Sequence, residues 1–403
     1  MLNKIDFDSA QKLIFENTFE LDFETVSLND ADGRVVYEDI FSEENIPPFA
    51  RSPFDGYALI ASDTSNAAND NPVSLRITEE IPAGSVAKKN IVSGSAAKIL
   101  TGAPIPDGAD LVIKYEDVDF DDRTITVYRP YAPGNICPEG EDIKKGTRIA
   151  CKGQIISYAL IGILAGLGIT ELKVYKIPEA ALISTGSELL DVTEKLTPGK
   201  IRNSSVYTLR SLLSASHIKA EIKGIVKDSE EEICDSILRE LKSHDTVITT
   251  GGVSVGDYDF IPRVVENLGA DTLFWKIRMK PGGSILVARL DKKLIFCLSG
   301  NPAAAAVSMI MLVIPALKKA AGIKDYETPY CDAVLLESFG KQSPVFRFVP
   351  AKSILREKQI LVSLPKMSGN GMLSPLDGAD CIAAIPAGSG KKEQGDTIKI
   401  YFI

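Results

Sequence analysis

The region between Pro178 and Pro329 constrains the fold more than any other part of this sequence, because short apolar segments alternate there with amphipathic ones. The alternating segments are residues 180–183, 206–214, 221–226, 230–241 and 246–248. Such alternation is typical of a parallel sheet with helices on both faces. The longest apolar run, residues 303–317, contains Pro315 and is shorter than the roughly 20 residues of a membrane-spanning helix, so we expect a buried helix.

Glycine turns follow three of the apolar segments in this region. They are residues 184–188 (STGSE), 250–252 (TGG) and 298–302 (LSGNP). In open α/β sheets, ligands bind beyond the carboxyl ends of the strands. We therefore expect the three turns to meet at one crevice. The last turn leads into a run of small residues that suits a helix start near an anion.

The second turn belongs to a longer loop, residues 249–259 (TTGGVSVGDYD), which combines glycines, hydroxyls and two carboxylates. A glycine loop after a strand exposes backbone N–H groups that bind an anion. Asp257 and Asp259 repel a phosphate, so their presence favours a divalent cation such as Mg²⁺ that bridges carboxylate and phosphate. The loop therefore predicts a phosphorylated, metal-assisted ligand.

These motifs, and other candidate site residues elsewhere in the chain, also have plainer interpretations. Residues 250–252 suit a tight turn without a ligand, since glycine is the default where the backbone turns sharply. Glu188 would favour a helix start through the helix dipole as readily as it would bind a metal. On spacing alone, Asp55-Gly56 is more typical of a hairpin turn than of a site. Lys276 and Lys280 suit either a solvated surface or a phosphate-binding site.

The segments that flank the α/β region predict other domains. Residues 7–19 have helical spacing, and helical character returns at residues 157–167. Between them, residues 55–141 contain short β-prone pieces separated by Gly, Pro, Asn and Asp turns, which indicates a compact β-rich domain. After Pro329 the pattern returns to short strands, which predicts a separate C-terminal β-domain.

Composition narrows the functional classes. The chain has 403 residues, of which 45% are hydrophobic, enough for more than one domain. Its formal net charge of −9 and the lack of a long basic cluster argue against a nucleic-acid partner. The six cysteines form no C-x-x-C pair and only two histidines accompany them, so neither a disulfide framework nor a zinc site is expected. Residues 1–23 lack the pattern of a signal peptide, which predicts a cytoplasmic protein without a membrane anchor.

The motifs, taken together and in order, carry a family resemblance over essentially the whole chain. The chain resembles the molybdopterin molybdenumtransferases of molybdenum-cofactor biosynthesis, the family that includes the eukaryotic gephyrin E domain. The matching segments are residues 52–58 (SPFDGYA), 100–104 (LTGAP), 133–143 (PGNICPEGEDI), 184–189 (STGSEL), 249–259, 279–282 (MKPG) and 299–302 (SGNP).

The resemblance implies a multidomain α/β protomer with a central doubly wound cofactor-binding domain. Its expected divisions are an N-terminal helical domain from residues 1–54 and 142–177, an inserted β-rich domain over 55–141, the α/β molybdopterin-binding domain over 178–326, and a C-terminal β-barrel over 327–403. It also implies a homodimer, with an active site between the α/β domain of one protomer and domains of its partner. Contact with a molybdopterin adenylyltransferase is a further possible partnership.

The implied reaction joins molybdate to the dithiolene of adenylated molybdopterin, with Mg²⁺-dependent release of AMP. By resemblance, the carboxylates assigned to Mg²⁺ and catalysis are Glu188 and Asp259, followed by Asp228 and Asp142. Asp55 and Thr101 would complete the site across the dimer. The residues expected to bind the pyrophosphate, the pterin phosphate or molybdate are Thr185, Gly186, Gly251, Gly252, Ser254, Gly256, Lys276, Lys280, Ser299, Asn301 and Pro302.

The chain departs from the family pattern at three places. Residues 203–205 read Asn-Ser-Ser where members commonly have Asp-Ser-Asn, Ser187 replaces a frequent acidic residue, and Ser299 replaces a frequent proline. These departures bear on ligand contacts. Molybdate and tungstate are both tetrahedral oxyanions that bind the same hydrogen-bond donors, so the sequence does not indicate which of them is the substrate.

Two other functional classes share part of the pattern. A molybdopterin adenylyltransferase or a competence-damage-type nucleotide hydrolase would explain residues 249–259, but neither would explain the Asp55 and Thr101 motifs or the C-terminal barrel. A non-catalytic scaffold would leave the carboxylates and lysines unexplained.

Overall fold

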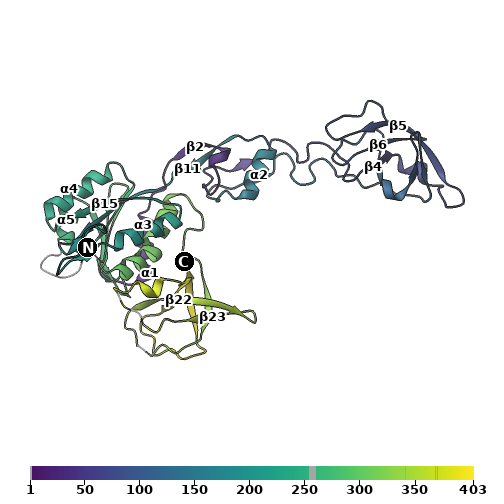
Figure 1. Ribbon diagram of the computed structural model, residues 1–403. Helices are drawn as coiled ribbons and strands as arrows, with labels where there is room; N and C mark the ends of the chain where they lie inside the picture. The colour runs from purple at the N-terminus through teal and green to yellow at the C-terminus, as the bar shows by residue number, and fades with distance from the viewer. Residues whose placement is uncertain (1, 254–259, 341, 368, 370) are drawn as a thin grey trace.

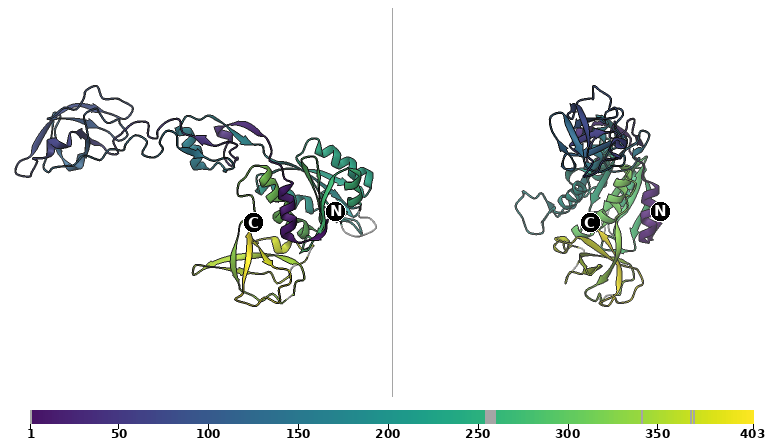
Figure 2. Two further views of the ribbon diagram at one scale, coloured as in Figure 1. Left: turned by 180° about the vertical axis from the view of Figure 1, so that it is seen from behind. Right: turned by 90° about the vertical axis from the view of Figure 1, so that its right-hand side faces the viewer.

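The architecture was obtained from a computed structural model, which describes residues 2–253, 260–340, 342–367, 369 and 371–403. Figures 1 and 2 show an elongated molecule. The α/β unit and the C-terminal β-domain lie at one end, residues 55–127 lie at the other, and helix α2 (Tyr158–Gly166) lies between them. The expected multidomain arrangement is thus confirmed.

The α/β unit is built on one mixed sheet. In spatial order its strands are β1 (Leu2–Ile5), β17 (Asp271–Ile277), β19 (Leu286–Leu290), β20 (Lys293–Leu298), β16 (Thr246–Thr250), β12 (Glu179–Thr185) and β15 (Lys219–Val226). Neighbours pair in parallel except at β19, which is antiparallel to both β17 and β20. The predicted strand segments, residues 180–183, 221–226 and 246–248, do pair in parallel, and β19 is not among them. Only Asp291 and Lys292 separate paired Leu290 and Lys293, and so short a connection permits only a hairpin.

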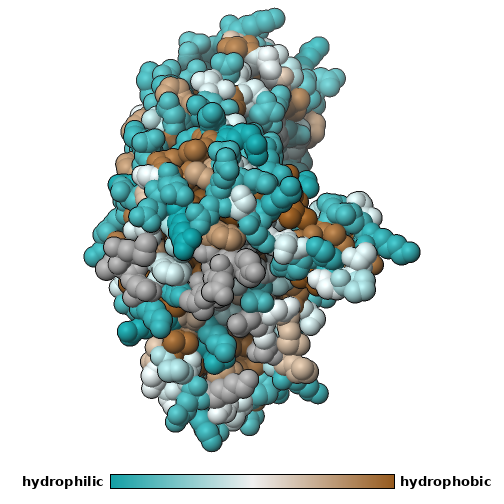
Figure 3. Space-filling model, turned by 90° about the vertical axis from the view of Figure 1, so that its left-hand side faces the viewer, coloured by the Kyte–Doolittle hydropathy of each residue, from teal (hydrophilic) through white to brown (hydrophobic). Residues whose placement is uncertain are grey.

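Helices cover both faces of this sheet, as the alternating pattern predicted. One face packs in a core with α1, α3, α6 and α7, and the other packs with α4 and α5. Figure 3 views this end of the molecule and shows a mainly hydrophilic surface with scattered apolar residues. The helices are α1 (Phe7–Glu16), α3 (Ser205–Ala215), α4 (Glu230–Leu241), α5 (Ile261–Asn267), α6 (Pro302–Ser308) and α7 (Ile314–Ala320).

The apolar helix that follows β20 is a core element. A π-helical turn, Met309–Val313, joins α6 to α7, so that Pro302–Ala320 forms one helical rod. The rod is long and apolar enough to cross a membrane, but 89% of its most apolar window is buried inside the protein. The prediction of a buried helix is therefore confirmed.

The N-terminal residues pack on the α/β unit. Strand β1 extends the sheet at β17, and the apolar side of α1, with Phe7 and Ile14, is buried in the core against Phe274. The structure differs here from the expected grouping of residues 1–54 with a helical domain. The burial of the apolar face of α1 against the sheet is the physical reason.

The unit between the two ends surrounds α2. Ser157 caps this helix by accepting a hydrogen bond from the Leu160 N–H at 3.4 Å. The unit also contains two small antiparallel sheets that the sequence pattern did not predict. They pair β2 (Phe23–Ser27) with β11 (Glu171–Tyr175) and β3 (Ile40–Phe41) with β10 (Arg148–Ala150).

The predicted β-rich domain is present at the far end. Its strands, in spatial order, are β7 (Leu111–Lys114), β4 (Gly56–Leu59), β6 (Ser95–Ile99), β5 (Val73–Ile81), β9 (Thr124–Val127) and β8 (Asp119–Phe120). Interpreting Asp55-Gly56 as a hairpin turn is wrong, because Gly56 begins β4 and pairs with Lys114 and Ile99. Glycine is required for another reason: a Cβ at Gly56 would lie 2.0 Å from the Ile113 carbonyl oxygen.

The C-terminal domain is a closed barrel, as predicted. Its strands run in the order β22 (Phe346–Arg356), β23 (Gln359–Ser363), β21 (Tyr330–Leu335), β25 (Thr397–Phe402) and β24 (Cys381–Ile385), and β24 pairs again with β22. The short strand β18 (Met279–Lys280) of the preceding domain adds to β22. This pairing fixes the barrel to the α/β unit near the end of β17.

Substituting Gly56→Ala tests the close packing of β4. The added methyl group would overlap the Ile113 carbonyl, and we expect the free energy of opening β4 and β7 to fall by about 1–3 kcal/mol. Amide hydrogen exchange of the two strands measures this change. Gly162→Ala in α2, where nothing lies within 4 Å of the new Cβ, is the control and should not destabilise. Unchanged exchange in the Gly56 variant would contradict this account.

Candidate active site

The turns that follow β12, β16 and β20 lie together, as predicted. Gly251 has φ +98°, and a Cβ there would lie 2.2 Å from the Thr185 carbonyl oxygen. A Cβ at Gly300 would lie 3.5 Å from the Gly251 Cα. The Gly251 N–H also donates to the Leu298 carbonyl at 3.1 Å. Backbone contacts between glycines therefore bring the three turns to one edge of the sheet.

Buried hydroxyls and an amide connect the first two turns beneath this edge. The hydroxyls of Ser184 and Thr250 are 3.1 Å apart, and the Asn203 side-chain amide donates to Ser184 Oγ at 2.9 Å. The Thr185 hydroxyl donates to the Thr250 carbonyl at 3.4 Å. The Asn203 Oδ1 is buried and has no hydrogen-bond partner among the residues that the structure describes.

Glu188 lies just beyond β12, in a turn that Asp228 stabilises. The Asp228 carboxylate accepts a hydrogen bond from the Ser187 N–H at 2.7 Å, and Lys200 Nζ donates to the Ser187 carbonyl. Glu188 is exposed, and within the described part of the chain no hydrogen bond engages its carboxylate. The strand β13 (Leu189–Leu190) follows, so the alternative that Glu188 favours a helix start is wrong.

Lys276 is linked to the glycine loop through Trp275. Its ammonium lies 4.3 Å from the centre of the Trp275 ring, and the Trp275 indole N–H donates to the Val253 carbonyl at 3.3 Å. A cation over an aromatic face is attracted by the ring quadrupole. The positive charge is thus held beside the loop that the sequence assigned to an anion.

Lys280 and Arg347 form a pair of cationic residues at the junction with the barrel. The two residues are partners in the β18–β22 pairing, and they line a small cavity of about 50 Å³ together with Ala303 at the start of α6. Arg347 Nε is buried without a hydrogen-bond partner among the described residues. Sequence reasoning missed Arg347 because a single arginine in a strand of another domain carries no local signal.

The third turn contains Ser299 and leads into α6, whose Ala303 lines this cavity. Ser299 is 8% exposed, and its hydroxyl accepts a hydrogen bond from the Asn301 N–H at 3.3 Å. Pro302 begins α6, and the Ser205 hydroxyl at the start of α3 donates to the Gly300 carbonyl at 3.4 Å. The hydroxyl that replaces a proline here therefore stabilises the turn.

Part of the predicted site lies outside the described residues. This applies to Ser254, Gly256, Asp257 and Asp259, whose roles stay predictions. In the ranges that the structure describes, no cluster of three or more His, Cys, Asp or Glu side chains is arranged to hold a metal ion.

Asp55 directly precedes β4 and Thr101 follows β6, two strands of the β-rich domain at the other end of the protomer (Figure 1). Asp142 lies in the connection to that domain, where its N–H donates to the Ile46 carbonyl at 3.0 Å. The Asp55 carboxylate accepts hydrogen bonds from the Thr101 N–H and hydroxyl, each at 2.7 Å. These two bonds, the backbone one foremost, lower the pKa of Asp55 below its ordinary value. Asp142 is exposed. One protomer therefore does not bring these residues to the glycine turns.

A cavity of about 490 Å³ adjoins this pair of residues and has Thr101 and Arg51 in its lining. Within it the Cys137 thiol donates to the Glu141 carboxylate at 2.7 Å. This hydrogen bond, with burial, raises the pKa of Cys137. The thiol therefore stays protonated at neutral pH.

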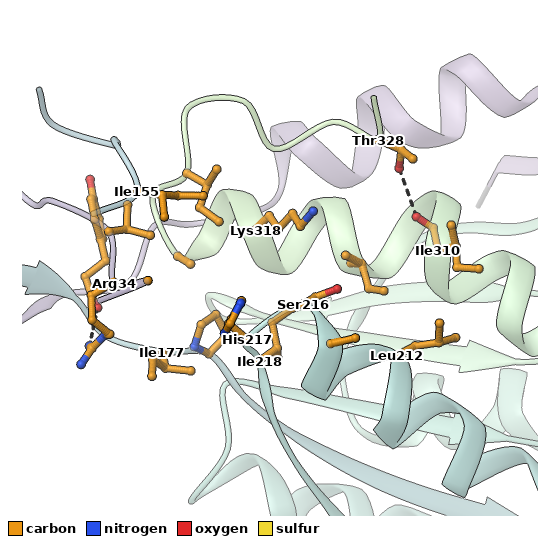
Figure 4. Close-up of a pocket in the computed structure, with 18 of the residues that line it drawn as sticks. Arg34, Ile155, Ile177, Leu212, Ser216, His217, Ile218, Ile310, Lys318 and Thr328 are labelled. Atoms are coloured by element: carbon orange, nitrogen blue, oxygen red, sulfur yellow. Dashed lines mark hydrogen bonds between the residues drawn. The ribbon is translucent and has the colours of Figure 1, made fainter. Parts of the chain in front are cut away.

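A further cavity, of about 510 Å³, lies at the opposite edge of the sheet from the glycine turns. Ile177 and Ile218, which precede β12 and β15, contribute to its apolar lining, and burial lowers the pKa of Lys318 there. Figure 4 shows Lys318 on the helical rod, with His217 and Ser216 from the end of α3 nearby. None of the predicted site residues lines it.

Comparison with known families covers the chain in three parts. Residues 5–168 match the MoeA N-terminal region (domain I and II), residues 181–319 match a probable molybdopterin binding domain, and residues 332–403 match the MoeA C-terminal region (domain IV).

Curated relatives and solved structures agree with these matches. A molybdopterin molybdenumtransferase of Staphylococcus aureus is 36% identical over 99% of this chain and 95% of its own length, and one of Staphylococcus epidermidis is 34% identical over 98% and 95%. A crystal structure of a molybdopterin biosynthesis MoeA protein from Pyrococcus horikoshii has a TM-score of 0.85 and 32% identity, and covers 99% of this chain and 100% of that one.

Thr101→Val tests the hydrogen bonding at Asp55. The change removes the hydroxyl donor but keeps the Thr101 N–H, so the pKa of Asp55 should rise and still stay below the ordinary aspartate value. A carboxyl NMR titration measures the shift. Thr101→Ser retains the hydroxyl and should leave the pKa unchanged; equal pKa values in the valine variant and the parent protein would refute the arrangement.

Proposed function

Because this chain belongs to the molybdopterin molybdenumtransferase family, we propose that it inserts molybdate into adenylated molybdopterin with Mg²⁺-dependent release of AMP. The observation that carries the proposal is the convergence of the three glycine turns at the carboxyl edge of the sheet. This is the edge at which open α/β sheets bind ligands.

The turns suit the pyrophosphate linkage of the substrate. Gly251 and Gly252 have positive φ angles, and Gly251 approaches the Thr185 carbonyl so closely that any larger residue would displace the backbone. Backbone N–H groups in such turns bind phosphate without steric interference. Lys276, held on Trp275 beside Val253, adds positive charge to the same loop.

The carboxylates suit Mg²⁺, which prefers oxygen ligands and keeps several waters. Glu188 would hold the ion, because its exposed carboxylate has no hydrogen-bond partner among the described residues. We propose Asp259 as the second ligand. Asp228 is hydrogen-bonded to the Ser187 N–H and would hold the Glu188 turn in place. When bound, the ion would offset charge as the phosphoanhydride breaks.

The junction with the barrel suits the oxyanion. Lys280 and Arg347 face one small cavity next to the start of α6, and Ser299 lies on the turn before that helix. Ammonium and guanidinium donors bind tetrahedral oxyanions by charge-assisted hydrogen bonds. Among the residues that the structure describes, the buried Arg347 Nε has no hydrogen-bond partner, so this donor would be available to the oxyanion.

We propose that a second copy of the chain completes the site with its Asp55, Thr101 and Asp142. Asp55 and Thr101 adjoin strands of the β-rich domain at the far end of the elongated protomer, and Asp142 lies in the connection to that domain. The glycine turns of the same chain therefore do not contact them. We propose that this homodimer works in the cytoplasm on small-molecule substrates. The formal net charge of −9 supports the absence of a nucleic-acid partner.

Release of AMP from adenylated molybdopterin tests the proposed reaction. The assay contains Mg²⁺ and is run without oxyanion, with molybdate and with tungstate. Release that depends on an oxyanion would support metal insertion and would rank the two metals. Release without an oxyanion would instead indicate a hydrolase, and no release at all would refute the proposed catalysis.

Glu188→Gln should slow AMP release. The amide is isosteric but neutral, so it would bind Mg²⁺ poorly, and we expect kcat to fall by about 100-fold. Single-turnover kinetics measures the effect. Glu194→Gln is the matched control, because Glu194 is an exposed carboxylate a few residues away. Equal rates in the two variants would exclude Glu188 from the metal site.

Arg347→Ala should weaken the use of molybdate. Loss of a charge-assisted donor worth about 1.5–3 kcal/mol predicts a rise in the KM for molybdate of roughly 10-fold to 100-fold. The KM for adenylated molybdopterin should change much less. Arg356→Ala removes an exposed arginine from the same strand and should leave both constants unchanged. An unaltered KM for molybdate in the Arg347 variant would show that Arg347 does not bind the oxyanion.

A further inference from the structure

Asn203 connects the segment that carries Glu188 to the sheet. It follows β14 (Ile201–Arg202), which pairs with β13 directly after Glu188. The Asn203 N–H donates to the Leu190 carbonyl at 2.9 Å, and the Ile201 N–H donates to the Glu188 carbonyl at the same distance. The segment β13–β14 therefore leaves the sheet after β12, and Asn203, which follows it, bonds back to Ser184 of β12.

The side chain of Asn203 begins a buried chain of hydrogen bonds. Its amide donates to Ser184 Oγ, and the Ser184 hydroxyl is hydrogen-bonded in turn to the Thr250 hydroxyl, with either hydroxyl able to donate. The three side chains are 4%, 0% and 2% exposed, respectively. Ser184 and Thr250 are also register partners in the β12–β16 pairing. These hydrogen bonds thus link the segment that follows Glu188 to β16, the strand that ends at the Gly251 turn.

The same short segment also reaches the third turn. Ser205, two residues after Asn203, donates its hydroxyl to the Gly300 carbonyl at 3.4 Å. The buried Asn203 Oδ1 has no partner among the described residues, which costs free energy that apolar packing would avoid. Because these buried hydrogen bonds lower the free energy of unfolding compared with apolar packing, we expect them to serve the positioning of the turns rather than stability alone.

We infer that Asn203 is a positioning residue for the transfer reaction, one that sets the spacing between Glu188 and the Gly251-Gly252 turn. The inference rests on the proposed function, because it assigns Glu188 and the turn to one chemical step. Asn203 acts through Ser184 and Thr250 and contacts no substrate. A misplaced reacting group loses rate even where the binding groups are retained.

Asn203→Ala tests this role with two readouts. We expect kcat for AMP release to fall roughly 10-fold to 100-fold, while the KM for adenylated molybdopterin changes less than about threefold. Without any substrate, amide hydrogen exchange should rise in peptides that cover residues 184–190 and 246–253 and stay unchanged in the barrel strand β22. Asn66→Ala, an exposed asparagine of the β-rich domain, is the matched control and should change neither readout.

A double variant decides whether the effect passes through Ser184. Ser184→Ala alone should reproduce the loss, and adding it to Asn203→Ala should cause little further loss because the two residues act as one unit. Additive losses, or exchange raised equally throughout the α/β unit, would show a merely structural role and overturn the inference. Parent-like kcat and exchange in Asn203→Ala would overturn it as well.

Failure of the inference remains distinguishable from failure of the proposed function. If the parent protein releases no AMP, the proposed function fails, and the exchange experiment still decides whether Asn203 links the two turns. If the parent protein releases AMP and Asn203→Ala releases it equally fast with unaltered exchange, only the positioning role fails.

Discussion

The contact between Gly251 and the Thr185 carbonyl is the constraint on which the arrangement of the site depends. It holds the end of β12 and the turn after β16 so close that position 251 tolerates no side chain. Gly300 then approaches Gly251 from the neighbouring strand. Strand pairing alone would place the three strand ends side by side, but backbone contact at the glycines is what makes their N–H groups and carbonyls form one surface.

Charge is distributed around this surface by different physical means. Lys276 is held by an aromatic ring, Lys280 by strand pairing with the barrel, and Asp228 by a backbone N–H of the Glu188 turn. Each anchor is local and belongs to a different element. Positive groups therefore flank the turns while the Glu188 carboxylate extends from the end of β12, an arrangement suited to a substrate that is anionic along its length and needs a cation at one bond.

Local patterns in the sequence predicted most elements but not their long-range partners. The alternation after Pro178 predicted the helices on both faces, and the turn residues predicted the β-rich domain and a C-terminal β-domain, while the resemblance implied that the latter is a barrel. Strand β1 at the sheet edge, the antiparallel β19 and the role of Gly56 depend on contacts between distant segments. The position of Arg347 also depends on a contact between distant segments, because only the pairing of β18 with β22 brings Arg347 to Lys280. The resemblance supplied Asp55 and Thr101 as predicted site residues, whereas spacing alone assigned Asp55 to a turn.

The β-rich domain is joined to the rest of the chain by two strands of polypeptide that run side by side, bridged between Ile46 and Ile143 and between Arg51 and Cys137. The domain stands at the end of a long arm, as Figure 2 shows from behind. A small bend near these bridges would therefore become a large displacement of Asp55 and Thr101, so the stiffness of this narrow neck governs how accurately the far end of the molecule can be placed.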